Sequence, residues 1–270
     1  MTMKRFLTIL LAAAITTMIA CGGGGETAAY EEDEELEEIV SAGGSATAAS
    51  GGGAAAAVAN AGTITGAVTL AGNPAPQSTI QMGADPACQA AHSSPVHAQN
   101  VVVNPAGQLA NVFVYVKDFR GAAPKPTEPA ILDQRGCQYF PHVGGVQVGQ
   151  TLRIRNSDPT LHNVHAMPKV NREFNIGQPV QGMTTDKVFD KPEVMVPFKC
   201  DVHNWMSSYL AVLPHPYFGT SNEQGSFQIA NLPPGTYTLE AWHEKFGTQT
   251  QQVTVAPNEQ KQVSFSFNAS

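Results

Sequence analysis

The chain has 270 residues, with 15 basic and 22 acidic side chains and a formal net charge of −7 at pH 7. Proteins that bind nucleic acids need a basic surface, so this balance argues against that class of function. The acidic excess lies in residues 22–61, which hold eight acidic residues and no Lys or Arg, so residues 62–270 are nearly neutral.

The first twenty residues have the pattern of an export signal. Lys4 and Arg5 precede a mostly apolar run at residues 6–20, which is shorter than the roughly 20 apolar residues of a membrane span. The run ends in Met-Ile-Ala-Cys at residues 18–21, which resembles the processing region of a bacterial lipoprotein signal. The resemblance implies that residues 1–20 are removed and that Cys21 becomes the lipidated first residue. An ordinary signal peptide followed by an unrelated cysteine is the alternative.

A lipidated Cys21 implies an exported protein that is anchored to a membrane, on its periplasmic side or at the cell surface. Gly22 stands after Cys21 in place of an aspartate, which favours the outer membrane by the same resemblance. Residues 21–61 then form a tether, because their acidic run at 31–38 and their Gly, Ala and Ser repeats offer no core-forming pattern. The acidic run as a binding site for a basic partner is the alternative to a solvated spacer.

From residue 62 onward, apolar and polar residues alternate as in half-buried β-strands. The alternating runs span residues 64–70, 112–116, 152–154, 227–229, 237–239, 253–255 and 263–267, and Gly, Pro and Asn separate them. No long segment has a convincing helical period. The sequence therefore predicts an all-β fold made of β-sandwiches.

One group of side chains in the middle of the chain has metal-binding chemistry. Cys200, His203 and Met206 have the spacing Cys-x-x-His-x-x-Met, and His162 follows an expected strand at residues 146–156. A thiolate, two imidazoles and a thioether are the ligands of a mononuclear blue-copper site, and they suit both Cu(I) and Cu(II). The set leaves no obvious open position for a substrate, which favours electron transfer over catalysis. A zinc site without the methionine is the alternative.

Three features together resemble the cupredoxins, and most closely the amicyanin-like and plastocyanin-like group. They are the Asn-Ser-Asp sequence at residues 156–158, His162-Asn163 and the downstream ligand loop. The resemblance implies a cupredoxin-like Greek-key sandwich at residues 62–213 with one type 1 copper. It carries over the four metal ligands His162, Cys200, His203 and Met206. It also implies that Asn163 orients the ligand loop by hydrogen bonds near the thiolate, and that the ring edge of His203 faces solvent as the electron port.

The C-terminal part has a second resemblance. Two motifs resemble the end of a carboxypeptidase-regulatory-like domain, which is a small transthyretin-like β-sandwich. They are Gly-Ser-Phe-Gln-Ile at residues 225–229 and Leu-Pro-Pro-Gly-Thr-Tyr at residues 232–237. Residues 214–270 are assigned to it. Residues 62–68 look like the opening strand of the same domain type, so two arrangements stay open. Either the copper domain is inserted into the transthyretin-like one, with early strands in 62–120 pairing with the C-terminal domain, or those strands belong to the copper domain.

Cys88 and Cys137 are left after the lipid and metal assignments, and in an exported protein we expect them to form a disulfide. A second metal site with His92 or His142 is the alternative. His165 points to the opposite strand face from His162 and is expected to pack or hydrogen-bond. The sequence assigns no role to His243. Trp205 either covers the metal, lines the surface where electrons enter, or simply packs.

These features together favour a lipid-anchored blue-copper protein that exchanges single electrons with a redox protein partner. The alternatives are a copper-binding or delivery protein without a redox role, and a surface β-module that binds carbohydrate or protein. The chain shows no paired carboxylates, serine-centred triad or phosphate-binding glycine loop, so we do not expect an enzyme.

Overall fold

The computed structural model describes residues 58–269, so the expected export signal, Cys21 and most of the expected tether lie outside the described residues. The described part contains sixteen β-strands and one helix of five residues, which confirms the predicted all-β class. Among residues 58–269, no helix has the length and apolar character needed to cross a membrane.

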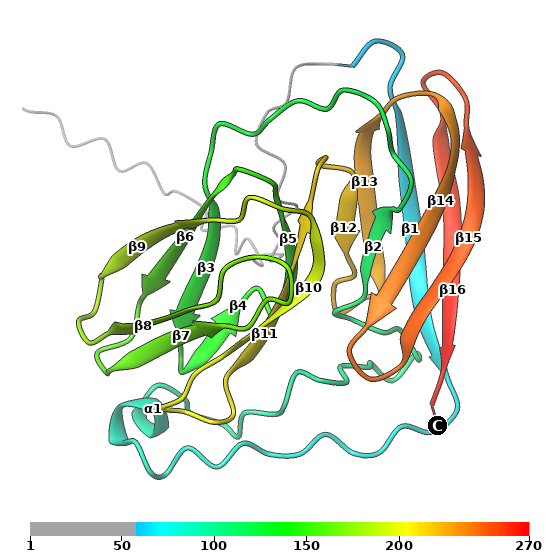
Figure 1. Cartoon of the computed structure of the whole chain (residues 1–270). Helices are drawn as coiled ribbons and strands as arrows, with labels where there is room; N and C mark the ends of the chain where they lie inside the picture. Colours follow the sequence, from blue (N-terminus) through cyan, green and yellow to red (C-terminus); the bar gives the residue numbers. More distant parts are fainter. Residues whose placement is uncertain (1–57, 270) are drawn as a thin grey trace, which may run out of the picture. The chain divides into compact units, whose positions relative to one another are not determined.

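The C-terminal strands form one β-sandwich together with two early strands (Figure 1). One sheet has the order β13-β1-β16 and the other the order β12-β2-β14-β15. The strands are β1 (Gly62–Ala71), β2 (Phe113–Val116), β12 (Phe218–Thr220), β13 (Ser226–Leu232), β14 (Gly235–His243), β15 (Gly247–Val255) and β16 (Gln260–Asn268). Inward-facing residues such as Ile64, Val68 and Leu239 are fully buried between the sheets.

The close packing of these sheets explains one glycine. A Cβ at Gly66 on β1 would lie 2.3 Å from the Phe227 ring and 2.9 Å from the Val263 carbonyl oxygen. Those two residues stand on the neighbouring strands β13 and β16, directly opposite Gly66 in both ladders. Only a residue without a side chain lets the Phe227 ring cross β1 at this point.

The remaining strands form a second β-sandwich, which carries the expected metal ligands. Its sheets have the orders β5-β11-β10-β7-β8 and β4-β3-β6-β9. The strands are β3 (Ala130–Arg135), β4 (Gln138–Phe140), β5 (Val143–Gln147), β6 (Thr151–Asn156), β7 (His162–Ala166), β8 (Phe174–Gln178), β9 (Thr184–Val188), β10 (Glu193–Lys199) and β11 (Ser207–Leu213). On β6, Leu152, Ile154 and Asn156 are buried and Arg153 and Arg155 are exposed, as the alternation predicts.

Strand pairing separates the two sandwiches differently from the expected boundary at residues 213 and 214. Strands β3 to β11 lie in the chain between β2 and β12, which pair with each other in one sheet. Strand β1 pairs with β13 and β16. The sequence left two arrangements open. The pairing of β2 with β12 corresponds to the one in which the ligand-bearing sandwich is inserted into the transthyretin-like one. The expected single strand at 146–156 was wrong, because β5 and β6 are separate strands in different sheets.

One early segment leaves the C-terminal sandwich and packs on the other. Residues 78–100, which we name the cap, contain the helix α1 (Pro86–Ala90) and place Ile80, Met82 and Val96 against the core of the ligand-bearing sandwich. Asp85 caps the start of the helix, because its side chain accepts hydrogen bonds from the backbone N–H groups of residues 87 and 88. Two backbone hydrogen bonds, Ile80 N–H to Val96 O and Ala98 N–H to Ser78 O, join the arms of the cap.

The predicted disulfide between Cys88 and Cys137 is confirmed, with an S–S distance of 1.97 Å and both residues buried. It links helix α1 of the cap to the turn between β3 and β4. The alternative use of either cysteine in a second metal site is therefore wrong for the oxidised protein.

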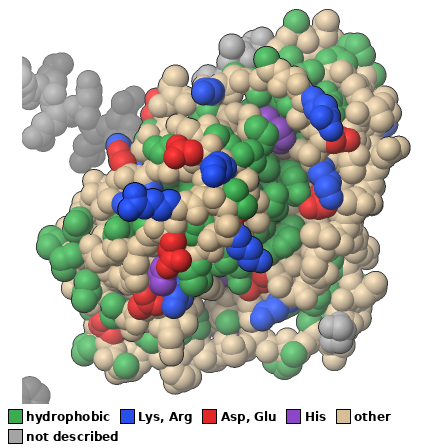
Figure 2. Space-filling view, in the orientation of Figure 1, with side chains coloured by type: hydrophobic (Ala, Val, Ile, Leu, Met, Phe, Trp, Pro, Cys, Tyr) green, Lys and Arg blue, Asp and Glu red, His purple; other side chains and the backbone are tan. Residues whose placement is uncertain are grey.

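The two sandwiches meet through a small apolar cluster that includes Phe113, Phe218, Val143 and Leu213. A buried polar contact lies beside it, in which His142 contacts the Ser207 carbonyl oxygen at 3.0 Å and the Glu244 carboxylate at 2.5 Å. On the face drawn in Figure 2, acidic and basic side chains are interspersed among polar ones, as the nearly neutral charge of residues 62–270 predicts.

Candidate metal centre

The loop before β7 positions the first histidine. Asn156 ends β6 with its side chain buried; its Oδ1 accepts from the Asp158 N–H at 2.9 Å and its Nδ2 donates to the Thr160 carbonyl oxygen at 2.9 Å. These bonds fold the chain so that Asp158 contacts the ring of His162, the first residue of β7. The Asn-Ser-Asp sequence is thus the local reason for the position of His162.

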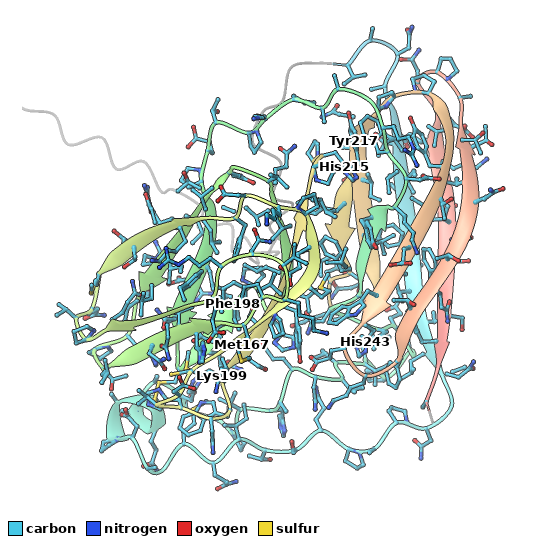
Figure 3. All side chains as sticks on the ribbon, viewed as in Figure 1. Met167, Phe198, Lys199, His215, Tyr217 and His243 are labelled. Atoms are coloured by element: carbon cyan, nitrogen blue, oxygen red, sulfur yellow. A yellow bond between two sulfur atoms is a disulfide. The ribbon has the colours of Figure 1, made fainter. Side chains whose placement is uncertain are left out.

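The other three expected ligands lie on the loop that joins β10 to β11. Figure 3 labels Phe198 and Lys199 at the end of β10, directly before Cys200. Within the loop, the His203 N–H lies 3.3 Å from the Cys200 sulfur, and the Cys200 N–H donates to the Met206 carbonyl oxygen at 3.2 Å. The backbone of the loop therefore fixes the relative positions of the ligands it carries.

The structure brings His162, Cys200 and His203 together. The two Nδ1 atoms lie 3.0 Å apart, and the Cys200 sulfur lies 3.8 Å from the His203 Nδ1. One donor atom from each residue lies within 4.8 Å of the others. Metal–ligand bonds of about 2.0–2.3 Å allow two donors on one ion to lie up to about 4.6 Å apart, so the 3.0 and 3.8 Å separations fit a single ion. Met206 is buried in the same core cluster as Cys200.

A carboxylate orients the first histidine. The His162 Nε2 lies 2.9 Å from Asp158 Oδ2, which leaves Nδ1 to face the cluster. Burial by itself would lower the pKa of His162, but hydrogen bonds and charge attraction from Asp158 and Cys200 outweigh it and raise the pKa to about 9. Asp158 is held in turn by the N–H groups of Gly136 and Cys137, at 2.7 and 2.8 Å.

The thiol of Cys200 is biased toward its anionic form. Burial raises its pKa, but contacts from His162 and from the backbone N–H groups of Asn163 and His203 outweigh burial and lower it. The Asn163 N–H lies 3.5 Å from the sulfur, and its side-chain oxygen accepts from the Asp201 N–H. Asn163 thus lies where the resemblance placed it, tying the ligand loop to β7. A thiolate is the form that binds a metal.

The ring edge of His203 is closed by the cap. Its Nε2 lies 3.0 Å from Asp85 Oδ2 and 3.6 Å from the Cys88 sulfur, and the residue is only 3% exposed. The expectation of a solvent-facing edge was wrong, because it came from a resemblance to the ligand loop and included no cap. Burial lowers the pKa of His203, against the attraction of Asp85. Burial raises the pKa of Asp85, but hydrogen bonds from Thr160 and His203 outweigh it and lower the pKa to about 2.

The other histidines lie away from the donor cluster. His165 contacts Asp201 at 3.0 Å and Glu173 at 2.8 Å on the outer face of β7. His92 contacts the Gly136 carbonyl oxygen at 2.7 Å. His215 and His243 lie in the C-terminal half of the chain, toward opposite ends of its sandwich (Figure 3).

Sequence reasoning missed Asp85 and Tyr139. Asp85 lies 118 residues before His203, and its Asp-Pro sequence indicates a helix start but not a contact with a histidine. The Tyr139 hydroxyl donates to the Asn163 carbonyl oxygen, and the Tyr139 ring is 1% exposed. A tyrosine in the middle of a three-residue strand gives no signal of this contact.

One family model and several solved structures are similar to parts of the chain. Residues 215–268 match the family of carboxypeptidase regulatory-like domains, as predicted. No curated protein sequence matches the chain. Similar solved structures include a mutant of amicyanin in the Cu(I) form, with 18% identity over 37% of this chain and 97% of that chain and a TM-score of 0.29.

A purple cupredoxin from Nitrosopumilus maritimus is similar at 20% identity, over 31% of this chain and 98% of that chain, with a TM-score of 0.27. A Cu-containing nitrite reductase from Thermus scotoductus is similar at 21% identity over 35% of this chain, with a TM-score of 0.28. The chain spans only 24% of that reductase. What the present chain binds is therefore argued from its own donor atoms.

Proposed function

We propose that the protein is a type 1 (blue) copper protein that transfers single electrons between redox partners. The observation that carries the proposal is the donor cluster, in which two imidazole Nδ1 atoms lie 3.0 Å apart and a buried cysteine sulfur lies 3.8 Å from one of them. His162, Cys200 and His203 would hold the ion, with Met206 as the weak fourth ligand. When bound, copper supplies a one-electron couple between Cu(II) and Cu(I).

The residues of the chain favour copper over zinc. A thioether adds little to a zinc site, whereas a single thiolate with two imidazoles and a weak thioether suits both copper oxidation states. Asp158 and Asp85 hold the outer nitrogens of the two rings, and the loop backbone holds the sulfur. Because neighbouring groups of the chain hold both rings and the sulfur, little rearrangement would accompany a change of oxidation state.

The burial of the cluster supports electron transfer over catalysis. His162, Cys200, His203 and Met206 are all at most 3% exposed. An electron can cross a layer of side chains, but a substrate has to reach the metal to react on it. We therefore propose an electron carrier and not an enzyme.

The proposal extends to location. The signal-like residues 1–20 and Cys21 support export and attachment to a membrane through a lipid, with the outer membrane favoured. The Cys88–Cys137 disulfide is in keeping with an oxidising compartment. In that setting the partner would be another redox protein beside the same membrane.

Voltammetry of the copper-loaded protein tests the function. We expect one reversible one-electron wave, and a changed potential in Met206→Leu because the weak fourth ligand tunes the couple. Met195→Leu is the matched control, since Met195 is also buried but lies in the cluster between the sandwiches. A copper-loaded protein with no reversible wave, which instead passes Cu(I) rapidly to an acceptor, would favour delivery and contradict the proposal.

A further inference from the structure

The cap closes the side of His203 from which a partner would otherwise approach. Asp85 and the Cys88 sulfur lie against the outer ring nitrogen at 3.0 and 3.6 Å. The disulfide holds this arrangement by joining the cap to the turn after β3. A partner molecule therefore cannot touch the outer nitrogen of the His203 ring and would have to approach the ring beside the cap.

Trp205 offers the neighbouring route. Its ring lies beside the His203 ring, with centroids 5.0 Å apart and planes tilted by 43°. The indole N–H donates to the Cys137 carbonyl oxygen at 3.0 Å, which fixes the orientation of the ring. Trp205 is half-buried, so it contacts His203 on one side and reaches the surface on the other.

The exposed side of Trp205 lines a cleft of about 690 Å³. The cap, the ligand loop and the turn between β14 and β15 each contribute to it, through residues that include Gln81, Gln99, Asn204 and Lys245. Its lining is dominated by hydroxyl, amide and small side chains. Within residues 58–269, the side chains of Gln81, Gln99 and Asn204 have no hydrogen-bond partner. The cleft thus presents part of the Trp205 ring and free polar groups, with little net charge.

We propose that this cleft binds a small planar hydroxylated aromatic of the hydroquinone class, which donates one electron to the metal through Trp205 and His203. The inference rests on the proposed function. The indole face suits an aromatic ring, because stacked aromatic pairs gain free energy beyond their buried area. The free amides suit phenolic hydroxyl groups, which both donate and accept hydrogen bonds. A charged donor would gain less in a cleft whose lining contains one acidic residue, Glu244, and one basic residue, Lys245.

The proposed step conserves electrons and protons. The hydroquinone loses one electron and one phenolic proton and becomes a neutral semiquinone radical. The electron reduces Cu(II) to Cu(I), and the proton passes to water in the open cleft. The semiquinone then leaves, and two semiquinones disproportionate in solution to one quinone and one hydroquinone.

Calorimetry with benzene-1,4-diol and the metal-free protein tests the site independently of the metal. We expect saturable binding that is weakened about tenfold in Trp205→Leu, because the stacking contact is lost. Ala98→Phe fills the cleft without altering Trp205 and should abolish binding. Ala90→Phe is the matched control, since Ala90 is exposed on the cap but does not line the cleft. Urea unfolding of each variant establishes that it is folded.

Stopped-flow reduction of the copper-loaded protein then tests the route. The rate should saturate with hydroquinone concentration and fall at least tenfold in Trp205→Leu and Ala98→Phe, but not in Ala90→Phe. A rate that stays proportional to concentration, or that neither variant changes, would overturn the inference while leaving the carrier function intact. Binding of a neutral disaccharide in place of the hydroquinone would overturn the ligand class. Hydroquinone binding without any reversible copper couple would instead refute the proposed function.

Discussion

The disulfide that holds the cap is open to a quantitative test, in which Cys88 and Cys137 are both replaced by alanine. The bond closes a loop with a sequence separation of 49 residues. In the chain-entropy description, a cross-link over a loop of this size removes about 4 kcal/mol of conformational freedom from the unfolded state, and native disulfides commonly contribute about 2–4 kcal/mol. We therefore expect the free energy of unfolding to fall by about 2–4 kcal/mol in the double variant.

Urea unfolding of the metal-free protein, followed by circular dichroism, measures this difference. The slope of the free energy against urea should rise slightly, because an unfolded chain without the cross-link exposes more surface. Wild-type protein unfolded in the presence of a thiol reductant is the matched control, and it should reproduce the value of the double variant. A loss below about 1 kcal/mol would refute the reasoning and mean that noncovalent packing holds the cap.

The same variant has a local consequence. Without the disulfide, the cap keeps its apolar contacts and a few hydrogen bonds, among them those of Asp85 with His203 and Thr160 and that of His92 with the Gly136 carbonyl oxygen. We expect faster hydrogen exchange at the cap amides of Ile80 and Ala98, which bond across its two arms. Exchange in β10 and β11, whose ladder does not involve the cap, should quicken only by the factor that corresponds to the loss of global stability.

Three further substitutions are informative. Asp158→Asn removes the charged partner of the first histidine ligand and should weaken Cu(II) binding by about 10–100-fold in a chelator competition, whereas Asp186→Asn on the exposed face of β9 should not. Tyr139→Phe leaves the Asn163 carbonyl oxygen without its buried donor and should cost about 1–2 kcal/mol in urea unfolding; an unchanged stability would show that water replaces the hydroxyl. Burial lowers the pKa of His243 from 6.5 to about 4. Because the unfolded chain therefore binds a proton at a higher pH than the folded chain, the free energy of unfolding falls by up to about 3 kcal/mol as the pH drops from about 6.5 toward 4. His243→Gln should flatten the decline of stability between pH 7 and pH 4.5, and an equally steep decline would contradict the assignment.

The sequence predicted the local parts of the candidate site well. Cys200, His203 and Met206 are close in the chain, so their spacing describes one loop, and Asn156 and Asp158 shape the turn that presents His162. Strand alternation also predicted the burial of residues such as Ile154 and Leu239, because the inward face of a strand is visible in its pattern.

Contacts between distant segments could not be predicted in the same way. The alternation on β1 indicates a strand but not its partners, and β1 pairs in parallel with β16 almost two hundred residues later. The contact of Asp85 with His203 depends on how the cap packs and on a disulfide partner that the sequence alone does not determine. For the same reason, the expectation of an exposed His203 ring edge failed.

The visible absorption spectrum of the purified protein after addition of Cu(II) tests the central claim most directly. A type 1 site predicts an intense thiolate-to-copper band that ascorbate bleaches, that returns on reoxidation, and that is absent in a folded Cys200→Ser variant. A wild-type protein that binds Cu(II) without this band, or a band that survives in Cys200→Ser, would contradict the account.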